Sequence, residues 1–418
     1  MIPTTGKADS RVALAGQVLQ LSVLRHDPAP FAPLFSRARA EIGHGQCLCR
    51  TPPLRLVIRC TRAGRWHLAG WPGEGLSHSP GCLFHKAIDE FTGRSSCAAG
   101  AITVTEQGTQ IRVDQPLRVQ MTAGDEAADL SRDRQARSTG TVSLLGLLHW
   151  LWEEAELNHW SPRWHRSWGT CRSRLSQVAA SCQVNGEPLG ELLHLAPAGR
   201  AAPREHPTLT AFTDRLADTP GITRRGLILG QLRSLKPTPY GERLHVTGLS
   251  RPLFASAAAM ARLRRSYRTA LSEAAGPTAR RIVLALVERS RGGYLTVASA
   301  AVMLCDSRFL PADSSYEVTM SGHLAACGRH FIKPLRYDAS DAVFPDFVLV
   351  DEDPHTVVEV YGIQGRETYE RRKRIKQLHY ADHEIPLVEW DVTDPLPDLR
   401  QPRAQLQLDL AGQMRTAR

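Results

Sequence analysis

The sequence predicts a multidomain α+β protein, with a β-rich N-terminal domain, a mostly helical middle and a C-terminal α/β domain. The chain has 418 residues, which is too long for one ordinary hydrophobic core. Short strand-like runs separated by turn residues fill much of residues 1–121. Apolar helix-like runs prevail in residues 141–275, and strand and helix patterns alternate in residues 276–418. We therefore expect domain boundaries near these positions.

The composition favours a globular protein with a polyanionic partner, of which DNA is the foremost candidate. Hydrophobic residues make up 42% of the chain, and the formal net charge is +10. No apolar run approaches the roughly 20 residues of a membrane-spanning helix, and the first residues lack the apolar segment of a signal peptide. The nine cysteines are unevenly spaced, which argues against a disulfide framework. We therefore expect a bacterial-type cytoplasmic protein with reduced thiols and no membrane contact.

Candidate metal ligands lie on both sides of a predicted hairpin near the N-terminus. The hairpin consists of Leu54–Cys60 and Arg65–Trp71, joined by a short turn. A CxC pair precedes the hairpin and an HxxxC pair follows it, so that the folded hairpin would bring the two pairs together. Four Cys and His ligands form the closed tetrahedral site of structural zinc, whereas the alternative is a set of buried thiols and ordinary loop histidines. The expected zinc ligands are Cys47, Cys49, His78 and Cys82, with Cys60 and His85 in reserve.

A linker is predicted after the first 121 residues. Before it, Ala101–Thr105 and Gln110–Val113 form a second predicted hairpin, which Pro116–Met121 extends. Residues 122–140 are rich in Asp, Arg, Ala and Ser, and they contain no aromatic residue. Such a composition buries too little apolar surface to fold, so we expect a flexible linker between the N-terminal domain and the middle.

The middle region combines apolar helices with a cluster of tryptophans. Val142–Ala155 and Phe254–Leu271 predict helices, whereas Gly221–Arg233 and Arg243–Leu249 predict strands around a turn. Five tryptophans crowd into residues 150–168, interleaved with arginines. Such aromatic rings can stack on nucleic-acid bases, although tryptophans more often belong to a core. The sequence leaves the role of this region open.

Two opposed acidic residues mark a second candidate metal site. Phe344–Val350 and Thr356–Tyr361 predict a hairpin around a four-residue loop, and its register places Asp346 opposite Glu359. Opposed residues have Cβ atoms about 5 Å apart on the same face of a sheet. Two carboxylates at that distance repel each other unless a proton or a cation lies between them. A hard cation with oxygen ligands, Mg²⁺ or Mn²⁺, would remove the repulsion.

Pro345-Asp346, followed by Glu359-Val360-Tyr361, resembles the PD-(D/E)xK signature of the restriction-endonuclease-like nucleases. The surrounding elements have a similar order of helix, three strands, helix and strand. In sequence order they are Ser315–Cys327, His330–Tyr337, Phe344–Val350, Thr356–Tyr361, Arg366–Asp382 and Pro386–Val392. The resemblance covers about the last quarter of the chain. It implies a restriction-endonuclease-like α/β core within residues 276–418, with DNA as the substrate and Mg²⁺ or Mn²⁺ as the catalytic cofactor, held by Asp346 and Glu359.

One position departs from this signature, because Tyr361 stands where the family has a lysine. That lysine steadies the attacking water and the charge that develops on the phosphate. The predicted helix over Arg366–Asp382 offers replacements, since Lys373 and Lys376 share a helical face with Tyr369. The expected catalytic residues are Asp346, Glu359, Glu317, Lys376 or Lys373, and Tyr361 at the lysine position. The expected DNA-binding residues are Arg366, Arg371, Arg372 and Arg374.

The whole layout also resembles an uncharacterised bacterial family carried on conjugative and other integrative mobile elements. The similar features are the CLCR and HSPGC segments, Ser314–Asp338, and the segments PDFVLV and VEVYG. This resemblance implies a mobile-DNA context but no activity. We expect a metal-dependent, nuclease-like DNA-processing protein. The alternatives are a non-catalytic nucleic-acid-binding protein with a degenerate nuclease fold, and a protein–protein adaptor in which the basic helix is only a solvated face.

Brief proteolysis should cut the protein first between Thr122 and Gly140, because an unfolded linker is the most accessible backbone. The cut should release an N-terminal fragment that contains the Cys/His cluster from a stable larger fragment. Gel electrophoresis with mass spectrometry of the fragments measures the cutting sites. Resistance of this stretch would contradict the predicted linker.

Overall fold

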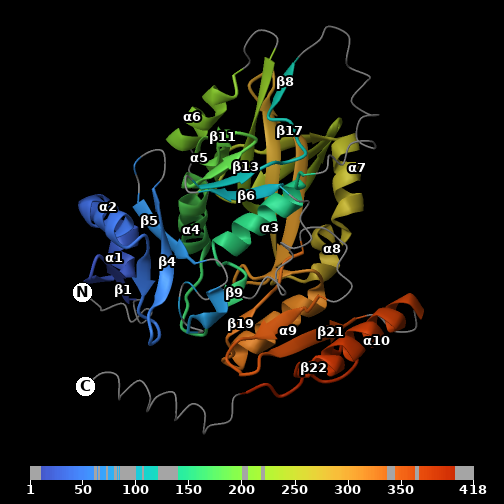
Figure 1. The fold of residues 1–418 in the computed structure, drawn as a ribbon. Coiled ribbons are helices and arrows are strands. Elements are labelled where there is room, and N and C mark those ends of the chain that lie inside the picture. The colour runs from blue at the N-terminus through green and yellow to red at the C-terminus, as the bar shows by residue number, and fades with distance from the viewer. Residues whose placement is uncertain are drawn as a thin grey trace, which may run out of the picture.

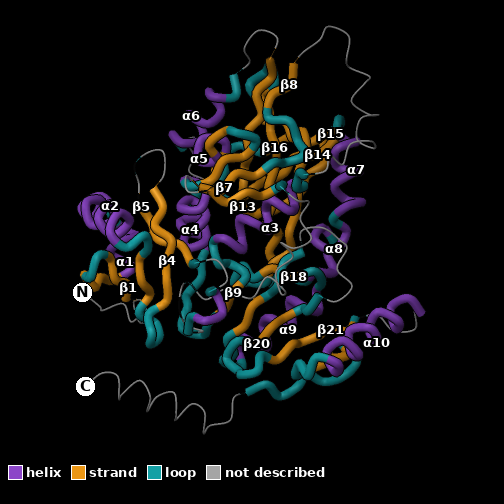
Figure 2. The backbone as a smooth tube through the Cα atoms, viewed as in Figure 1, coloured by secondary structure: helices purple, strands orange, loops and turns teal. Residues whose placement is uncertain are grey.

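The computed structural model describes residues 11–60, 64, 66–71, 74–79, 82, 84, 100–105, 108–120, 140–199, 206–217, 222–336, 344–362 and 367–400. Within these residues the chain forms ten α-helices and four β-sheets. Figures 1 and 2 show an N-terminal module beside a central β-rich body, with a smaller C-terminal sheet at one end of that body. The expected mixture of helices and strands is therefore confirmed, whereas the predicted linker 122–140 lies outside the described residues except for Gly140.

The N-terminal module is a five-stranded sheet in the order β2-β1-β3-β4-β5, accompanied by two helices. The strands are β1 (Arg11–Leu14), β2 (Gln17–Gln20), β3 (Gly45–Cys47), β4 (Leu54–Cys60) and β5 (Trp66–Gly70). The helices are α1 (Leu21–His26) and α2 (Ala32–Glu41). The predicted hairpin is confirmed, since β4 and β5 pair antiparallel with Ile58 opposite Leu68. Alternate residues of these strands are buried with Phe35 of α2, which gives the module a core of its own.

A four-stranded sheet and a layer of helices follow. The sheet has the order β11-β10-β7-β6, with β6 (Ile102–Thr105), β7 (Gly108–Ile111), β10 (Cys182–Val184) and β11 (Glu187–Pro188). The helices are α3 (Leu144–Glu154), α4 (Trp168–Ala180) and α5 (Leu189–Leu192). Trp150 and Trp152 belong to α3 and are almost fully buried in the core against which this helix packs. These two tryptophans are therefore core residues and do not form a stacking surface.

The largest sheet closes into a barrel. Its members are β8 (Arg118–Gln120), β12 (Leu193–Leu195), β13 (Ile222–Thr238), β14 (Gly241–Val246), β15 (Leu253–Ser256), β16 (Arg280–Arg289), β17 (Leu295–Cys305) and β18 (Pro311–Ala312). The helices α6 (Pro207–Arg215), α7 (Ala257–Ser266) and α8 (Arg268–Leu271) lie against it. Five strands run in the order β13-β14-β15-β17-β16, and β16 pairs back onto β13. The ring of backbone hydrogen bonds is thus closed among these five strands.

The C-terminal sheet has the order β22-β21-β20-β19-β9. Its strands are β9 (His159–Trp160), β19 (Phe331–Ile332), β20 (Phe347–Leu349), β21 (Thr356–Tyr361) and β22 (Leu387–Asp391), and its helices are α9 (Ser315–Ala326) and α10 (Glu367–Asp382). The strands β19, β20 and β21 pair antiparallel in succession, and β22 is parallel to β21. The edge strand β9 comes from the middle region and pairs with β19, which ties the two regions together.

The elements are distributed differently from the sequence prediction. The region 141–275, expected to be mostly helical, also contributes the 17-residue strand β13 together with β14 and β15. The strands β16 and β17 pair with β13 and with each other, so residues 280–305 belong to the barrel although the prediction placed them in the C-terminal domain. Likewise β7 pairs with β10, and β8 pairs with β13, instead of joining the N-terminal module. These pairings join segments far apart in sequence, which local patterns do not reveal.

Among the described residues, no helix combines the length and the apolar composition needed to span a bilayer.

Candidate functional site

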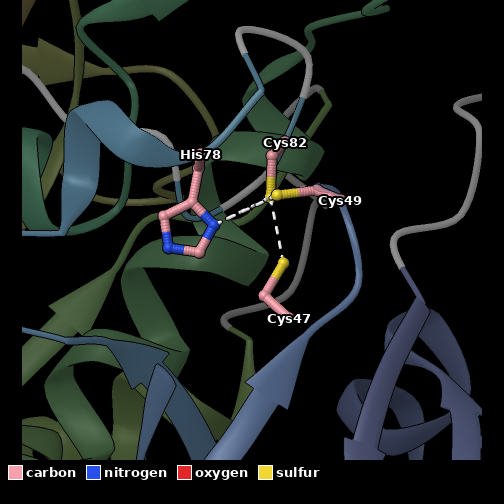
Figure 3. A group of neighbouring side chains, drawn as sticks. All are labelled: Cys47, Cys49, His78 and Cys82. Carbon is pink, nitrogen blue, oxygen red and sulfur yellow. Dashed lines mark hydrogen bonds between the residues drawn. The ribbon is translucent and has the colours of Figure 1, made fainter. Parts of the chain in front are cut away.

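The predicted Cys/His ligands come together at one end of the N-terminal sheet. Cys47 ends β3, and Cys49 follows two residues later. A 3₁₀ turn over Gly75–Ser77 precedes His78, and Cys82 lies one further turn along the chain. Figure 3 shows the three sulfur atoms and the imidazole Nδ1 of His78 pointing toward a common centre. The four side chains that spacing alone selected are therefore the four that converge.

The distances within this cluster match a tetrahedral metal centre. The Sγ atoms of Cys47 and Cys82 are 3.5 Å apart, and Nδ1 of His78 lies 3.3 Å from Sγ of Cys49 and 3.6 Å from Sγ of Cys82. All four ligand atoms lie within 4.8 Å of one another. Zinc bonds of about 2.3 Å to sulfur and 2.0–2.1 Å to nitrogen would separate neighbouring ligand atoms by about 3.5–3.8 Å. The cluster could therefore hold a zinc ion.

The charge state of the sulfurs also suits a cation. Hydrogen bonds from the neighbouring thiols lower the pKa of Cys49 far below that of an ordinary thiol. The hydrogen bond with Cys49 raises the pKa of Cys47 to about 12, and hydrogen bonds with Cys47 and Cys49 strongly raise the pKa of Cys82. Protein groups alone thus stabilise one thiolate among three buried or half-buried sulfurs. A bound dication would stabilise the other two as thiolates, because a coordinated thiol is deprotonated.

Hydrogen bonds hold the two ligand pairs in place. The hydroxyl of Ser79 donates to the carbonyl oxygen of Cys49 at 2.7 Å, and Arg50 donates to the carbonyl oxygen of Ser77 at 2.9 Å. Of the two reserve ligands, Cys60 lies at the far end of β4 opposite Trp66 and does not join the cluster. His85 lies outside the described residues.

The second candidate site lies in the C-terminal hairpin, whose register agrees with the prediction. Phe347 pairs with Val358 and Leu349 with Thr356. One step further along the same register, Asp346 stands opposite Glu359. Oδ2 of Asp346 accepts a hydrogen bond of 2.9 Å from the backbone N–H of Val360, which fixes this carboxylate against β21.

Glu359 is almost fully buried, and both of its carboxylate oxygens have partners. Oε2 lies 2.7 Å from Nζ of Lys376, and Oε1 accepts a 2.7 Å hydrogen bond from the hydroxyl of Tyr380. Lys376 also donates to the carbonyl oxygen of Phe344 at 2.8 Å. Burial raises the pKa of Glu359 to about 7, the negative charge of Asp346 adds to the rise, and Lys376 opposes it. The helix α10 thus delivers a cation to the position facing the acidic pair.

A buried lysine that the sequence analysis missed lies beside this pair. Lys333 follows β19, and its ammonium group lies 2.7 Å from Oε2 of Glu317 and 3.1 Å from Oδ2 of Asp313. Burial opposes the charged form, but the carboxylates of Asp313, Glu317 and Asp346 raise the pKa of Lys333 above that of an ordinary lysine. Burial raises the pKa of Glu317 to about 7. The sequence signal for this buried lysine was its position within the apolar run FIKPL.

The remaining predicted site residues are spread along α10 and β21. Tyr361 is buried, and the ammonium group of Lys373 lies 4.2 Å from the centre of its ring, so Lys373 contacts the aromatic residue at the lysine position. The exposed cations of α10 are Arg371, Arg372 and Arg374. Arg371 makes a loose pair with Glu367 at 3.4 Å. Arg366 lies outside the described residues.

Comparison with protein families identifies the family of the chain. Residues 19–393 match the family DUF1173, which is described as a protein of unknown function. The chain belongs to this family. The DUF1173 match includes the Cys/His cluster and the C-terminal acidic pair, so both lie in the part of the chain that the family shares. Searches of curated proteins and of solved structures gave no match.

Cys49→Ser should release the metal and unfold the N-terminal module, because metal binding at such a site contributes folding free energy. Elemental analysis of untagged protein should find about one zinc ion per chain in the wild type and much less in the variant. Cys60→Ser, which removes a cysteine outside the cluster, should retain the zinc. A fully folded preparation that contains no metal would contradict the assignment.

Lys333→Met should lower the free energy of unfolding by about 3–5 kcal/mol, because it leaves the buried Glu317 without its cation. Adding Glu317→Gln should restore part of the loss, since the unpaired charge is then removed. Urea unfolding followed by circular dichroism measures both effects. The matched change Lys236→Met at an exposed position should stay within about 0.5 kcal/mol of wild type. An equally small effect of Lys333→Met would show that this ion pair is not structural.

Proposed function

We propose that the C-terminal region is a metal-dependent, nuclease-like site that hydrolyses phosphodiester bonds in DNA. The observation that carries the proposal is the ion pair between Lys376 and Glu359. It supplies a cation at the acidic pair although Tyr361 has replaced the lysine of the PD-(D/E)xK signature. A lysine delivered from the following helix compensates for the one departure from that signature.

The order of elements supports the same proposal. The succession α9, β19, β20, β21, α10 and β22 has the helix, three strands, helix and strand of the restriction-endonuclease-like core. The motif residues Asp346 and Glu359 lie next to each other on the central hairpin β20–β21. Short antiparallel pairing fixes their separation, and the return of α10 over the sheet brings Lys376 to them.

The proposed roles follow from the donor atoms. Asp346 and Glu359 would hold Mg²⁺ or Mn²⁺, since two opposed carboxylates are the oxygen ligands that such hard ions prefer. When bound, the metal would activate water and stabilise charge on the phosphate. Lys376 would neutralise charge that develops on the phosphate. Glu317, which faces Lys333, is the third acidic group.

The exposed arginines of α10 would contact the DNA backbone. Arg371, Arg372 and Arg374 project into solvent, where their guanidinium groups can bind phosphates. In this proposal the Cys/His cluster holds a structural zinc ion, because four protein ligands leave no open position for a reacting water. The mobile-element context and the cytoplasmic location belong to the same proposal.

A non-catalytic DNA-binding protein is the second candidate. One observation favours it, namely that Glu359 is only 1% exposed and both of its oxygens are engaged by Lys376 and Tyr380. A carboxylate held in this way would have to exchange a partner before it could bind a metal ion. In this candidate function the ammonium group of Lys376, and not a metal ion, offsets the repulsion between the carboxylates of Asp346 and Glu359.

Cleavage of plasmid and oligonucleotide DNA with Mg²⁺ or Mn²⁺ separates the two candidates. Lys376→Ala should slow the cleavage step by about two to three orders of magnitude, the scale of losing one transition-state charge partner. Glu359→Gln and Asp346→Ala should abolish cleavage, whereas DNA binding by Glu359→Gln should persist. The control Arg400→Ala removes an exposed cation that pairs with Asp398, and it should cleave like wild type.

If wild type and Glu359→Gln both bind DNA and neither cleaves it with any divalent metal, the non-catalytic candidate is correct. If neither protein binds DNA, α10 is a solvated face and the adaptor alternative applies.

A further inference from the structure

The central barrel has an architecture that the proposed function does not use. Its strands β13, β14 and β15 form an antiparallel meander, and β15 pairs parallel with β17. The strands β16 and β17 form an antiparallel pair, and β16 closes the ring on β13. In sequence, the helices α7 and α8 follow the third strand, β15, and precede the fourth, β16. A closed five-stranded barrel of this kind is the architecture of the OB-fold, which binds oligonucleotides on its second and third strands and adjacent loops.

Among the described residues, the apolar core that covers the outer face of other barrel strands does not extend over β14 and β15, the second and third strands. Leu244, Val246, Leu253 and Ala255 point inward into the barrel core. The outward residues of β13, β16 and β17, such as Leu229 and Met303, pack in the other core beneath α3 and α4. No described residue of β14 or β15 belongs to that second core. Figure 2 shows β14 and β15 on the side of the barrel next to α7.

A row of cationic and aromatic side chains crosses this outer face. Lys236 pairs with Arg243, Arg243 pairs with Phe254, and Phe254 pairs with Thr296. Directly paired residues lie on the same face, so the four side chains form a continuous line across four neighbouring strands. The guanidinium carbon of Arg243 lies 5.9 Å from the ring centre of Phe254.

Two exposed tyrosines stand at the loops that flank this row. Tyr240, in the turn between β13 and β14, is 88% exposed, and Tyr294, in the loop between β16 and β17, is 59% exposed. The ring of Tyr294 contacts Phe254 edge to face, with ring centres 5.4 Å apart. Tyrosines this exposed contribute little to a hydrophobic core, so stability does not account for them.

The charge around the row is positive. Residues 222–256 contain six Arg or Lys residues and one acidic residue, Glu242, which is paired with Arg264 of α7. A second carboxylate, Glu288, stands opposite Thr296 at the end of the row, and Arg225 pairs with it at 3.1 Å. Burial lowers the pKa of His245, and the positive charges of Lys236, Arg233 and Arg243 lower it further. The face is therefore complementary to a polyanion that also carries flat aromatic groups.

We propose that the outer face of β14 and β15, with the loops that carry Tyr240 and Tyr294, binds a single strand of DNA. The rings of Tyr240, Tyr294 and Phe254 would stack on bases, and Lys236 and Arg243 would contact phosphates. Stacking requires unpaired bases, which excludes an intact duplex as the occupant. The choice of DNA over RNA rests on the proposed function, whereas the single strand follows from the aromatic row.

The test measures binding of full-length protein to a fluorescein-labelled oligo(dT) of about 15 nucleotides by anisotropy, without added Mg²⁺ or Mn²⁺. Tyr240→Ala and Tyr294→Ala should each weaken binding by about 5- to 100-fold, the cost of losing one stacked base. Tyr240→Phe and Tyr294→Phe keep the rings and should bind like wild type. Arg243→Gln should reduce the slope of log K against log salt by about 0.7. The affinity for a duplex of the same length should not change when either tyrosine is replaced by alanine.

Three outcomes would overturn the proposal. They are no binding of oligo(dT) by wild type, equal affinity of the tyrosine-to-alanine variants and wild type for oligo(dT), and binding of oligo(U) by a protein that does not bind oligo(dT). The measurement involves no hydrolysis, so its result is independent of whether the C-terminal site cleaves DNA. Loss of cleavage in Glu359→Gln with unchanged oligo(dT) binding would show that the two sites are separate.

Discussion

The backbone pairing of β13 is the constraint on which the rest of the structure depends. This strand pairs with β8 and β12 near its start, with β16 through its middle and with β14 at its end. It changes partner at Leu232, where a register shift bends it around the barrel. Gly230 allows β14 to pack closely against this strand, because a Cβ there would lie 2.5 Å from a methyl group of Val246. Strands from four separate parts of the chain, β8, β12, β14 and β16, thus all pair with one strand.

At both candidate sites, strand or loop geometry brings groups of like charge close together, and a cation would offset their repulsion. At the N-terminal cluster three sulfurs and an imidazole converge, and a cation would allow more than one thiolate. At the C-terminal hairpin the sheet register opposes Asp346 and Glu359, and Lys376 supplies the positive charge. Protein cations are thus in place beside the carboxylates, whereas the part of the chain that the structure describes places no Lys or Arg side chain among the sulfurs. The carboxylates therefore have a protein cation as well as a metal ion to offset their repulsion, whereas the sulfurs would depend on a bound metal ion.

Sequence reasoning succeeded where the determining contacts are local. The register of β20 and β21 follows from strand periodicity and a short loop, and the four Cys/His ligands follow from a hairpin of known span. It failed where partners are distant in sequence. The closure of β16 onto β13 joins residues 49 to 63 positions apart, from Leu232 with Arg281 to Arg225 with Glu288, and no local pattern records such pairing. Lys333 was missed because its partner Glu317 lies on a helix, so that only the folded chain shows the buried pair.

The junction between the barrel and the C-terminal sheet connects the two proposals physically. The buried Asp306 follows β17, accepts hydrogen bonds from the backbone N–H groups of Arg308 and Leu310, and accepts another from Ser321 of α9 at 2.9 Å. The indole of Trp152 donates to the carbonyl oxygen of Phe309 at 3.0 Å, which ties the same segment to α3. These hydrogen bonds join the barrel, α9 and α3 through one short segment, and such networks restrict local motion. In the two proposals taken together, this junction is the connection through which a strand of DNA bound on the barrel would be held relative to the acidic pair.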